Sequence, residues 1–234
     1  MNYAIGDIHG EYNKLVTLLE KITPDAEDTI YVLGDTIDRG PESMKVLFKL
    51  MELPNAVFIA GNHEMMALQC LKYLNQEITE ENIDSFDTEK IGKLTDWMIN
   101  GGTETMKSFR ALSAEDRQDV MDFLMEFDTC AEVEAGGKRY ILVHGCLDNF
   151  SPERPIWEYD LNELIWHRAE YDKCYFKDRY LVTGHTPTQS IEDNPKPGYI
   201  YRKNNHIAID CGACFEGGRL AAICLETGEE FYAE

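Results

Sequence analysis

The residues from 34 to 40, Gly-Asp-Thr-Ile-Asp-Arg-Gly, combine the side chains best suited to chemistry in this chain. They follow the apolar run 30–33, which is typical of a buried strand, and precede Pro41, which suits the start of a helix. Asp35, Asp38 and Arg39 place two carboxylates and a guanidinium in one turn. Charges held this close are costly unless opposite charges bind them. The turn therefore predicts a site for metal ions and phosphate.

Two other predicted strands end in metal-ligand side chains. Asp7 and His9 follow residues 2–5, and Asn62 follows residues 56–60. A helical pattern comes next each time, so the segments read as βαβ units of a parallel sheet, whose strands end along one edge. Asp7 and His9 are two residues apart and in extended backbone would share one face. We expect both to bind one ion there with Asp35.

Two histidines later in the chain complete a second set of ligands. His144 follows the predicted strand 139–143, and His185 follows the predicted strand 180–183. With Asn62 they offer imidazole and amide donors, which suit divalent manganese, iron or zinc. If Asp35 bridges, the two ions lie about 3.5–4 Å apart and can activate one shared hydroxide.

His63 follows the ligand Asn62 and is the candidate general acid. Neighbours in extended backbone face opposite ways, so we expect His63 to point away from the metals toward substrate. Asp38 can accept its other N–H, fix its tautomer and raise its pKa. His63 would then protonate the leaving alkoxide, an effect typically worth about 10²–10⁴-fold.

Composition limits the class of protein. The chain has 234 residues, of which 44% are hydrophobic, enough for a core without disulfides, and a net charge of −21. This charge disfavours nucleic acid and anionic membrane as partners. No signal peptide or membrane-spanning run is visible, and seven cysteines without regular spacing fit reduced thiols, so we expect a cytoplasmic protein. Its oligomeric state is left open.

The remaining pattern predicts one domain, residues 1–234, with a helical cap inserted at about 65–128. Within the cap, Asn100-Gly101-Gly102 should interrupt a helix. Residues 130–134 and 139–143 form a predicted hairpin. Short strands at 199–201, 206–209, 220–225 and 230–232 suggest a second, largely antiparallel sheet packed on the first. The expected class is α/β, a two-sheet β-sandwich flanked by helices.

Taken together in this order, the motifs resemble those of the calcineurin-like metallophosphoesterases, and more narrowly the bacterial and bacteriophage-lambda type of serine/threonine protein phosphatase. The motifs are Asp7-Ile8-His9-Gly10, Gly34-Asp35-Thr36-Ile37-Asp38-Arg39-Gly40, Gly61-Asn62-His63-Glu64, His144-Gly145 and Gly184-His185-Thr186. The resemblance implies the family's α/β/β/α fold. It also implies that Asp35 bridges two divalent ions, with manganese the expected metal and iron or zinc the alternatives.

By the same resemblance, Asp7, His9 and Asp35 bind one metal, and Asp35, Asn62, His144 and His185 bind the other. Arg39 and a second arginine would hold the phosphate. We nominate Arg168 for the second, with Arg179 as its competitor. The expected substrate is a phosphorylated protein or a small phosphoester. The alternatives are a symmetrical dinucleoside-tetraphosphate hydrolase and a non-catalytic interaction module on the same fold.

Several other residues have a simpler interpretation. His167 and His206 lie outside any motif and are expected to be structural or surface residues. Cys211 and Cys214 have redox C-x-x-C spacing without the strand-to-helix setting that such sites need. Packing is the expected role of the three tryptophans, Trp97, Trp157 and Trp166, although Trp97 could flank the cleft.

Overall fold

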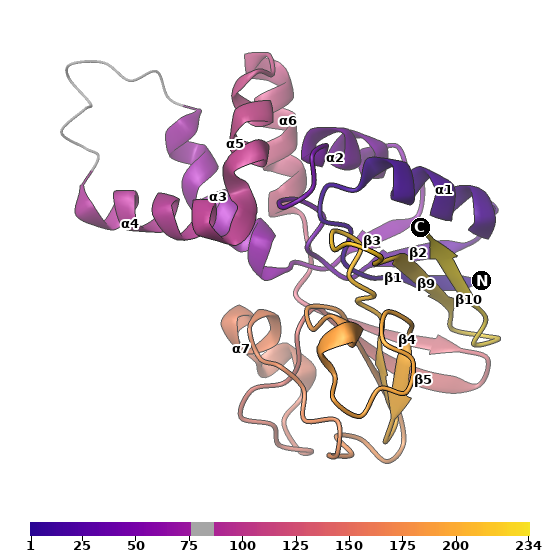
Figure 1. Cartoon of the computed structure of the whole chain (residues 1–234). Coiled ribbons are helices and arrows are strands. Elements are labelled where there is room, and N and C mark those ends of the chain that lie inside the picture. The colour runs from indigo at the N-terminus through magenta and orange to yellow at the C-terminus, as the bar shows by residue number, and fades with distance from the viewer. Residues whose placement is uncertain (76–86) are drawn as a thin grey trace.

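Two sheets packed face to face form the centre of the molecule (Figure 1). The computed structural model describes residues 1–75 and 87–234. The first sheet has the order β10-β9-β1-β2-β3, with β1 (Asn2–Ile5), β2 (Thr29–Val32), β3 (Ala56–Phe58), β9 (Leu220–Cys224) and β10 (Glu230–Ala233). The second has the order β4-β5-β6-β8-β7, with β4 (Ala131–Ala135), β5 (Lys138–Val143), β6 (Tyr180–Thr183), β7 (Tyr201–Lys203) and β8 (His206–Ala208).

The first sheet begins as predicted, with two βαβ units in parallel. β1 pairs with β2 from Asn2↔Thr29 to Ile5↔Val32, and β2 pairs with β3 in the same direction. The first crossover is helix α1 (Tyr12–Ile22), whose Leu15, Leu18 and Ile22 are buried against the sheet. The second is α2 (Ser43–Met51). The two crossovers bring the ends of β1, β2 and β3 to one edge.

The prediction that the late strands form a second, largely antiparallel sheet is wrong in two respects. The late strands β9 and β10 join the first sheet, where β9 pairs antiparallel with β1. The second sheet is mixed, because β5, β6 and β8 are parallel while β4 and β7 pair antiparallel at its edges. Local alternation could not reveal this, since it indicates a half-buried strand but not its partner.

The apolar residues between the sheets come from strands far apart in sequence. Ala4 and Ile223 from the first sheet pack with Leu142, Val182 and Ile207 from the second. Helix α7 (Leu161–Ile165) and its loops cover the outer face of the second sheet, as Figure 1 shows. These layers match the predicted α/β sandwich flanked by helices.

Between β3 and β4 the described residues are mostly helical, and these helices extend beyond the sandwich (Figure 1). They are α3 (Asn62–Leu74), α4 (Thr88–Trp97), the π-helix η2 (Met98–Gly102), α5 (Thr103–Arg110) and α6 (Ala114–Met125). Gly101 interrupts the helix with a φ of 105°, as predicted. The single domain with a cap at about 65–128 stays a prediction, and residues 76–86 of that cap lie outside the described residues. Within residues 1–75 and 87–234, no helix combines the length and apolarity that crossing a bilayer requires.

Candidate metal and phosphate site

Five strand ends bring the proposed ligands to one place, because β1, β2 and β3 of one sheet and β5 and β6 of the other all end at the same side of the sandwich. The side chains that follow these strands are Asp7, His9, Asp35, Asn62, His144 and His185. All except His185, which is partly buried, are buried. The parallel pairing of β5 with β6 makes His144 and His185 neighbours, with ring centroids 5.1 Å apart.

Asp35 lies at the centre of the cluster. Its Oδ2 is 3.6 Å from His9 Nε2, and its Oδ1 is 3.3 Å from His144 Nε2. His144 Nε2 also lies 3.1 Å from Asn62 Oδ1. Two groups of donors close enough to hold an ion share this carboxylate: one comprises His9, Asp35 and His63, and the other comprises Asp35, His144 and His185. This arrangement suits a bridging carboxylate between two ions.

The donors fit divalent ions in chemistry as well as position. His9 Nδ1 lies 3.0 Å from the Ile37 carbonyl and His144 Nδ1 lies 2.6 Å from the Leu33 carbonyl, so both rings can donate outward and direct a free Nε2 inward. The glycines keep the cluster close: a Cβ on Gly61 would lie 2.2 Å from Asp35 Oδ1, and one on Gly184 would lie 2.2 Å from Asp7 Oδ1. The residues therefore fit two oxygen- and nitrogen-coordinated ions.

The charged groups in the cluster shift one another's pKa values. Burial acts to raise the pKa of Asp35, but the imidazoles of His144 and His63 outweigh it and hold that pKa well below its usual range. Burial acts to lower the pKa of His144, but the carboxylate of Asp35 raises it to about 10. For His9 burial dominates and lowers the pKa to about 3. A neutral imidazole of this kind is the form that binds metal.

Asp7 interacts with Asp210, a residue to which the sequence analysis assigned no role. The His185 N–H donates to Asp7, 3.0 Å from its Oδ1. Burial and the carboxylate of Asp210 raise the pKa of Asp7 well above its usual range. Asp210 follows β8, which is parallel to β6, and burial raises its own pKa to about 6. The signal that could have found it is the same one used elsewhere, a carboxylate directly after a short apolar strand.

The predicted hydrogen bond between His63 and Asp38 is present, but the backbone that positions His63 is helical and not extended as predicted. His63 Nδ1 lies 2.7 Å from Asp38 Oδ2. The extended-backbone argument is wrong, because Asn62 and His63 begin helix α3. It is also wrong for Asp7 and His9, since His9 has a φ of 48°. Burial acts to lower the pKa of His63, but the carboxylates of Asp35 and Asp38 raise it above its usual value.

Arg39 reaches into the same space from an exposed position. Its Nη1 lies 2.8 Å from His9 Nε2, and its Nη2 lies 3.0 Å from His63 Nε2. The guanidinium thus connects a proposed metal ligand with the proposed acid. Asp35, Asp38 and Arg39 have φ values of 48°, 71° and 66°, which non-glycine residues rarely adopt. Strained backbone of this kind is concentrated at functional sites.

Glu64 holds the strained turn from beneath. It accepts hydrogen bonds from the backbone N–H groups of Asp35, Thr36 and Gly61 at 2.7–2.9 Å. It lies in the first turn of α3, where a carboxylate also satisfies the helix N-terminus. The Gly-Asn-His-Glu motif contained this residue, but sequence reasoning assigned it no role.

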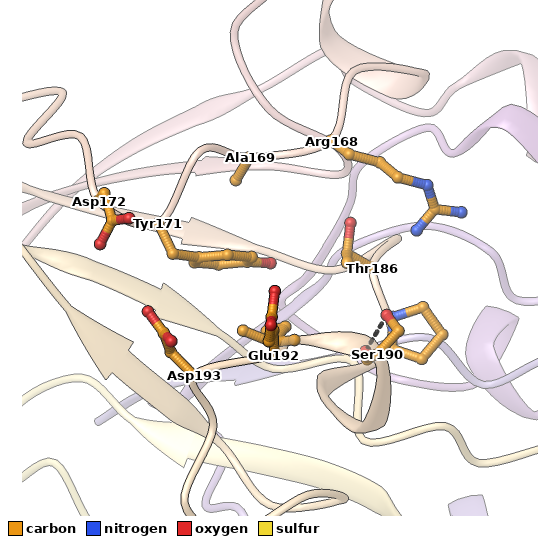
Figure 2. Close-up of a pocket in the computed structure, with 10 residues that line it drawn as sticks. Arg168, Ala169, Tyr171, Asp172, Thr186, Ser190, Glu192 and Asp193 are labelled. Carbon is orange, nitrogen blue, oxygen red and sulfur yellow. Dashed lines mark hydrogen bonds between the residues drawn. The ribbon is translucent and has the colours of Figure 1, made fainter.

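Arg168 lines a cavity of about 800 Å³ beside the cluster, and its Nη1 lies 3.5 Å from the His185 carbonyl oxygen. Figure 2 shows Arg168 and Thr186 at one end of this cavity and Asp172 and Asp193 at the other. The competitor Arg179 is paired with Asp178 instead. The structure therefore places Arg168, and not Arg179, next to a proposed metal ligand.

The other residues considered in the sequence separate clearly. The prediction that the tryptophans are packing residues is wrong for Trp157 and Trp166, which are 72% and 44% exposed. It is confirmed for Trp97, which is fully buried.

The remaining histidines and the cysteines lie outside the cluster. His206 is buried with Nε2 2.8 Å from Thr183 Oγ1, and His167 lies 3.6 Å from Asp148. The seven cysteines are free thiols, and burial raises the pKa of Cys214 to about 11. A pKa in this range does not suit a reactive thiol.

A sequence profile described as calcineurin-like phosphoesterase matches residues 3–208. Among curated proteins, the chain is 33% identical over 211 residues to serine/threonine-protein phosphatase 2 of Escherichia coli (strain K12), covering 85% of each chain. It is 35% identical over 230 residues to the symmetrical bis(5'-nucleosyl)-tetraphosphatase of Baumannia cicadellinicola subsp. Homalodisca coagulata, covering 96% of this chain and 68% of that one.

The fold also resembles that of a solved protein serine/threonine phosphatase from Saccharomyces cerevisiae. The TM-score is 0.61 at 15% identity, with 100% of this chain and 80% of the yeast chain covered. At this identity the likeness concerns the fold alone. The sequence matches to two differently named groups leave the substrate to be argued from the site.

Proposed function

The chain belongs to the calcineurin-like phosphoesterase family, and we propose that within this family it removes phosphate from phosphoserine and phosphothreonine in proteins, with manganese as its metal. The family is one of metal-dependent phosphoesterases, and the protein is an enzyme of that kind. The substrate class, the metal and the role of each residue are our proposals. The observation that carries the substrate class is the acidic cavity beside the metal ligands.

Six side chains would hold the two ions, with Asp35 shared between them: Asp7, His9, Asp35, Asn62, His144 and His185. When bound, divalent ions neutralise phosphate charge and activate water for attack on phosphorus. Glu64 keeps Asp35 in place by accepting hydrogen bonds from three backbone N–H groups, one of them that of Asp35 itself. Arg39, next to His9 and His63, and Arg168, next to the His185 carbonyl, would supply guanidinium donors for the phosphoryl oxygens.

His63 would supply the proton that the reaction needs. As the bond from phosphorus to the leaving oxygen breaks, Nε2 of a protonated His63 gives its proton to that oxygen, while Asp38 keeps Nδ1–H in place. The raised pKa of His63 favours this protonated form. Once Nε2 carries a proton it no longer accepts from Arg39, whose Nη2 can then bind the phosphoryl group.

The cavity favours a peptide over a dinucleotide. Three carboxylates, from Asp172, Glu192 and Asp193, line the cavity together with Arg168. Lys203, behind the lining, pairs with Asp172 and Asp193, so that the five groups together carry one net negative charge. A dinucleoside tetraphosphate would bring further negative charge to this surface, whereas basic residues beside a phosphorylated residue would complement it. The net charge of −21 acts in the same direction.

A competition between substrates tests the proposal. Manganese-loaded protein is given a phosphothreonine peptide flanked by arginine, the same peptide flanked by glutamate, and diadenosine tetraphosphate. We expect the arginine peptide to have a kcat/KM about fivefold above that of the glutamate peptide, since one or two complementary pairs contribute about 1 kcal/mol. Glu192→Gln should reduce this preference, and Glu132→Gln on the exposed face of β4 serves as the control.

A higher kcat/KM for diadenosine tetraphosphate would overturn the protein substrate in favour of the dinucleotide hydrolase. That second candidate is supported by the match to the Baumannia cicadellinicola enzyme over 96% of this chain. No hydrolysis of any of the three substrates after manganese is added would support the non-catalytic module instead.

A further inference from the structure

Helices α4 and α5 make specific contacts with the turn that carries Asp38 and Arg39. Trp97 Nε1 donates to Asp38 Oδ2 at 2.7 Å. The Asp38 N–H donates to Thr105 Oγ1 at 3.1 Å, and the Arg39 N–H donates to the Gly101 carbonyl at 3.0 Å. Three contacts from a segment more than fifty residues away thus hold two residues with left-handed backbone.

The indole N–H of Trp97 has Asp38 as its hydrogen-bond acceptor. Trp97 has no exposed surface and packs with Ile37, Met44 and Phe109. Gly102 lies directly against the ring, because a Cβ there would come within 2.4 Å of Nε1. Water has no access to the N–H, and a buried donor without a partner is costly. The position of the indole is therefore tied to that of the carboxylate.

Trp97 and His63 use the same oxygen. Both donor nitrogens lie 2.7 Å from Asp38 Oδ2, while Asp38 Oδ1 has no hydrogen-bond partner among the described residues. With the backbone N–H of Asp38 held by both Ser43 and Thr105 and its carboxylate held by Trp97, the carboxylate cannot turn away from His63. The imidazole is oriented in turn, since Nδ1 bonds to Asp38 and Nε2 faces Arg39.

We propose that Trp97 is a positioning residue for leaving-group protonation: its N–H fixes Asp38, which fixes His63. The inference rests on the proposed function, because it concerns the acid step of the same site. It assigns to the helices between β3 and β4 a part in the chemistry itself. The general-acid pair is then supported from two sides, by helix α3 and by the α4–α5 segment.

Substitution of Trp97 by Phe tests this, because it removes the N–H and keeps an aromatic ring. We expect kcat for a phosphothreonine peptide, whose alkoxide leaving group needs a proton, to fall about tenfold with KM unchanged. With p-nitrophenyl phosphate, whose leaving group barely needs one, kcat should fall less than about twofold. Phe109→Leu is the matched control, since it alters the same apolar cluster without touching Asp38.

A second variant covers the possibility that Trp97→Phe does not fold. Site-specific replacement of Trp97 by 3-benzothienylalanine keeps the shape of indole and puts sulfur in place of N–H. It should give the same selective loss. A double-mutant cycle with Asp38→Asn adds a readout that packing alone would not move, because residues acting through one carboxylate give non-additive losses in kcat.

Equal losses on the two substrates, no loss on either, or additive losses in the cycle would each overturn the positioning role. These outcomes presuppose a wild-type protein that hydrolyses both phosphomonoesters. Failure of the wild type on both would overturn the proposed function itself, so the two failures are told apart by the wild-type rates.

Discussion

The ligand cluster around Asp35 and the neighbouring turn of Asp38 and Arg39 lie side by side but are built differently. Each ligand comes shortly after a strand, so the order of the strands in the two sheets mainly determines where it lies. The turn depends in addition on helices that come much later in the chain, through Trp97, Gly101 and Thr105. The first region is a product of sheet topology, and the second is a product of contacts between remote segments.

The difference explains why the two regions should respond differently to substitution. Loss of a ligand removes charge or a donor from the place where ions bind, which affects every substrate. Loss of a contact to the turn leaves the ligands in place and shifts Asp38 or Arg39 by a fraction of an ångström. Such a shift should change phosphate binding or leaving-group dependence while metal binding is kept.

The largest effect is expected from the ligand cluster. Asp35→Asn keeps the size of the side chain but removes the charge that His9 and His144 face at 3.6 and 3.3 Å. We expect manganese affinity to fall and kcat/KM to drop at least about 10³-fold on all phosphoesters, because metal activation contributes several kcal/mol. Calorimetric titration with manganese and initial rates after chelation and re-addition provide the measurement.

Asp122→Asn is the control for this substitution, because Asp122 is an exposed carboxylate on α6 bonded only to Gln118 in the described part of the chain. It should leave manganese binding and turnover unchanged. Wild-type rates in Asp35→Asn would remove this carboxylate from the site.

An intermediate effect is expected from the turn. Gly101 has a φ of 105°, and a Cβ there would lie 2.8 Å from Arg39 Cγ. Gly101→Ala should push Arg39 aside and raise KM for phosphomonoesters about tenfold, because one charge-assisted phosphate contact is weakened. Manganese affinity should stay the same, which distinguishes the turn from the ligand cluster.

Gly137→Ala provides the matched control for backbone strain. Gly137 also has a positive φ, 72°, but it lies in the β4–β5 hairpin with no atom within 4 Å of an added Cβ. Both substitutions should lower the free energy of unfolding by about 1 kcal/mol or more. Only Gly101→Ala should change KM, and a similar change in Gly137→Ala would mean that strain alone is responsible.

The smallest effect is expected from His206, which lies outside both regions. Measuring it separates the effect of pH on stability from its effect on catalysis. Burial lowers the pKa of His206 to about 3, below the value of about 6.5 in an unfolded chain. The unfolded state then binds the extra proton first, so stability is present above pH 6.5 and lost as the pH falls. We expect a loss of about 1 kcal/mol between pH 6.5 and 5.5.

Urea unfolding at the two pH values measures this loss. His206→Gln can still bond Thr183 and should reduce the slope, while its activity profile stays parallel to that of the wild type. An unchanged slope in this variant would assign the pH dependence of stability to other groups.

Much of the architecture could be predicted from local pattern. Strand 180–183 was predicted with the bounds that the structure shows, and the helix break at Gly101 is also confirmed. The pairing of β9 and β10 with the first sheet was not predicted, because alternation of apolar and polar residues does not name a partner strand. Glu64 was identified only as part of a motif, and its role could not be predicted, since that role depends on backbone N–H groups of another loop.

The sequence by itself determined the family, through the ordered motifs that resemble it, and the set of candidate ligands, because each is a polar side chain placed after a predicted apolar strand. That order along the chain can be read without a structure. Only the tertiary structure decided that Trp97 and His63 meet on one oxygen of Asp38 and that Arg168 lies beside His185. Such contacts join residues that are distant in sequence, and their geometry depends on how helices and sheets pack together.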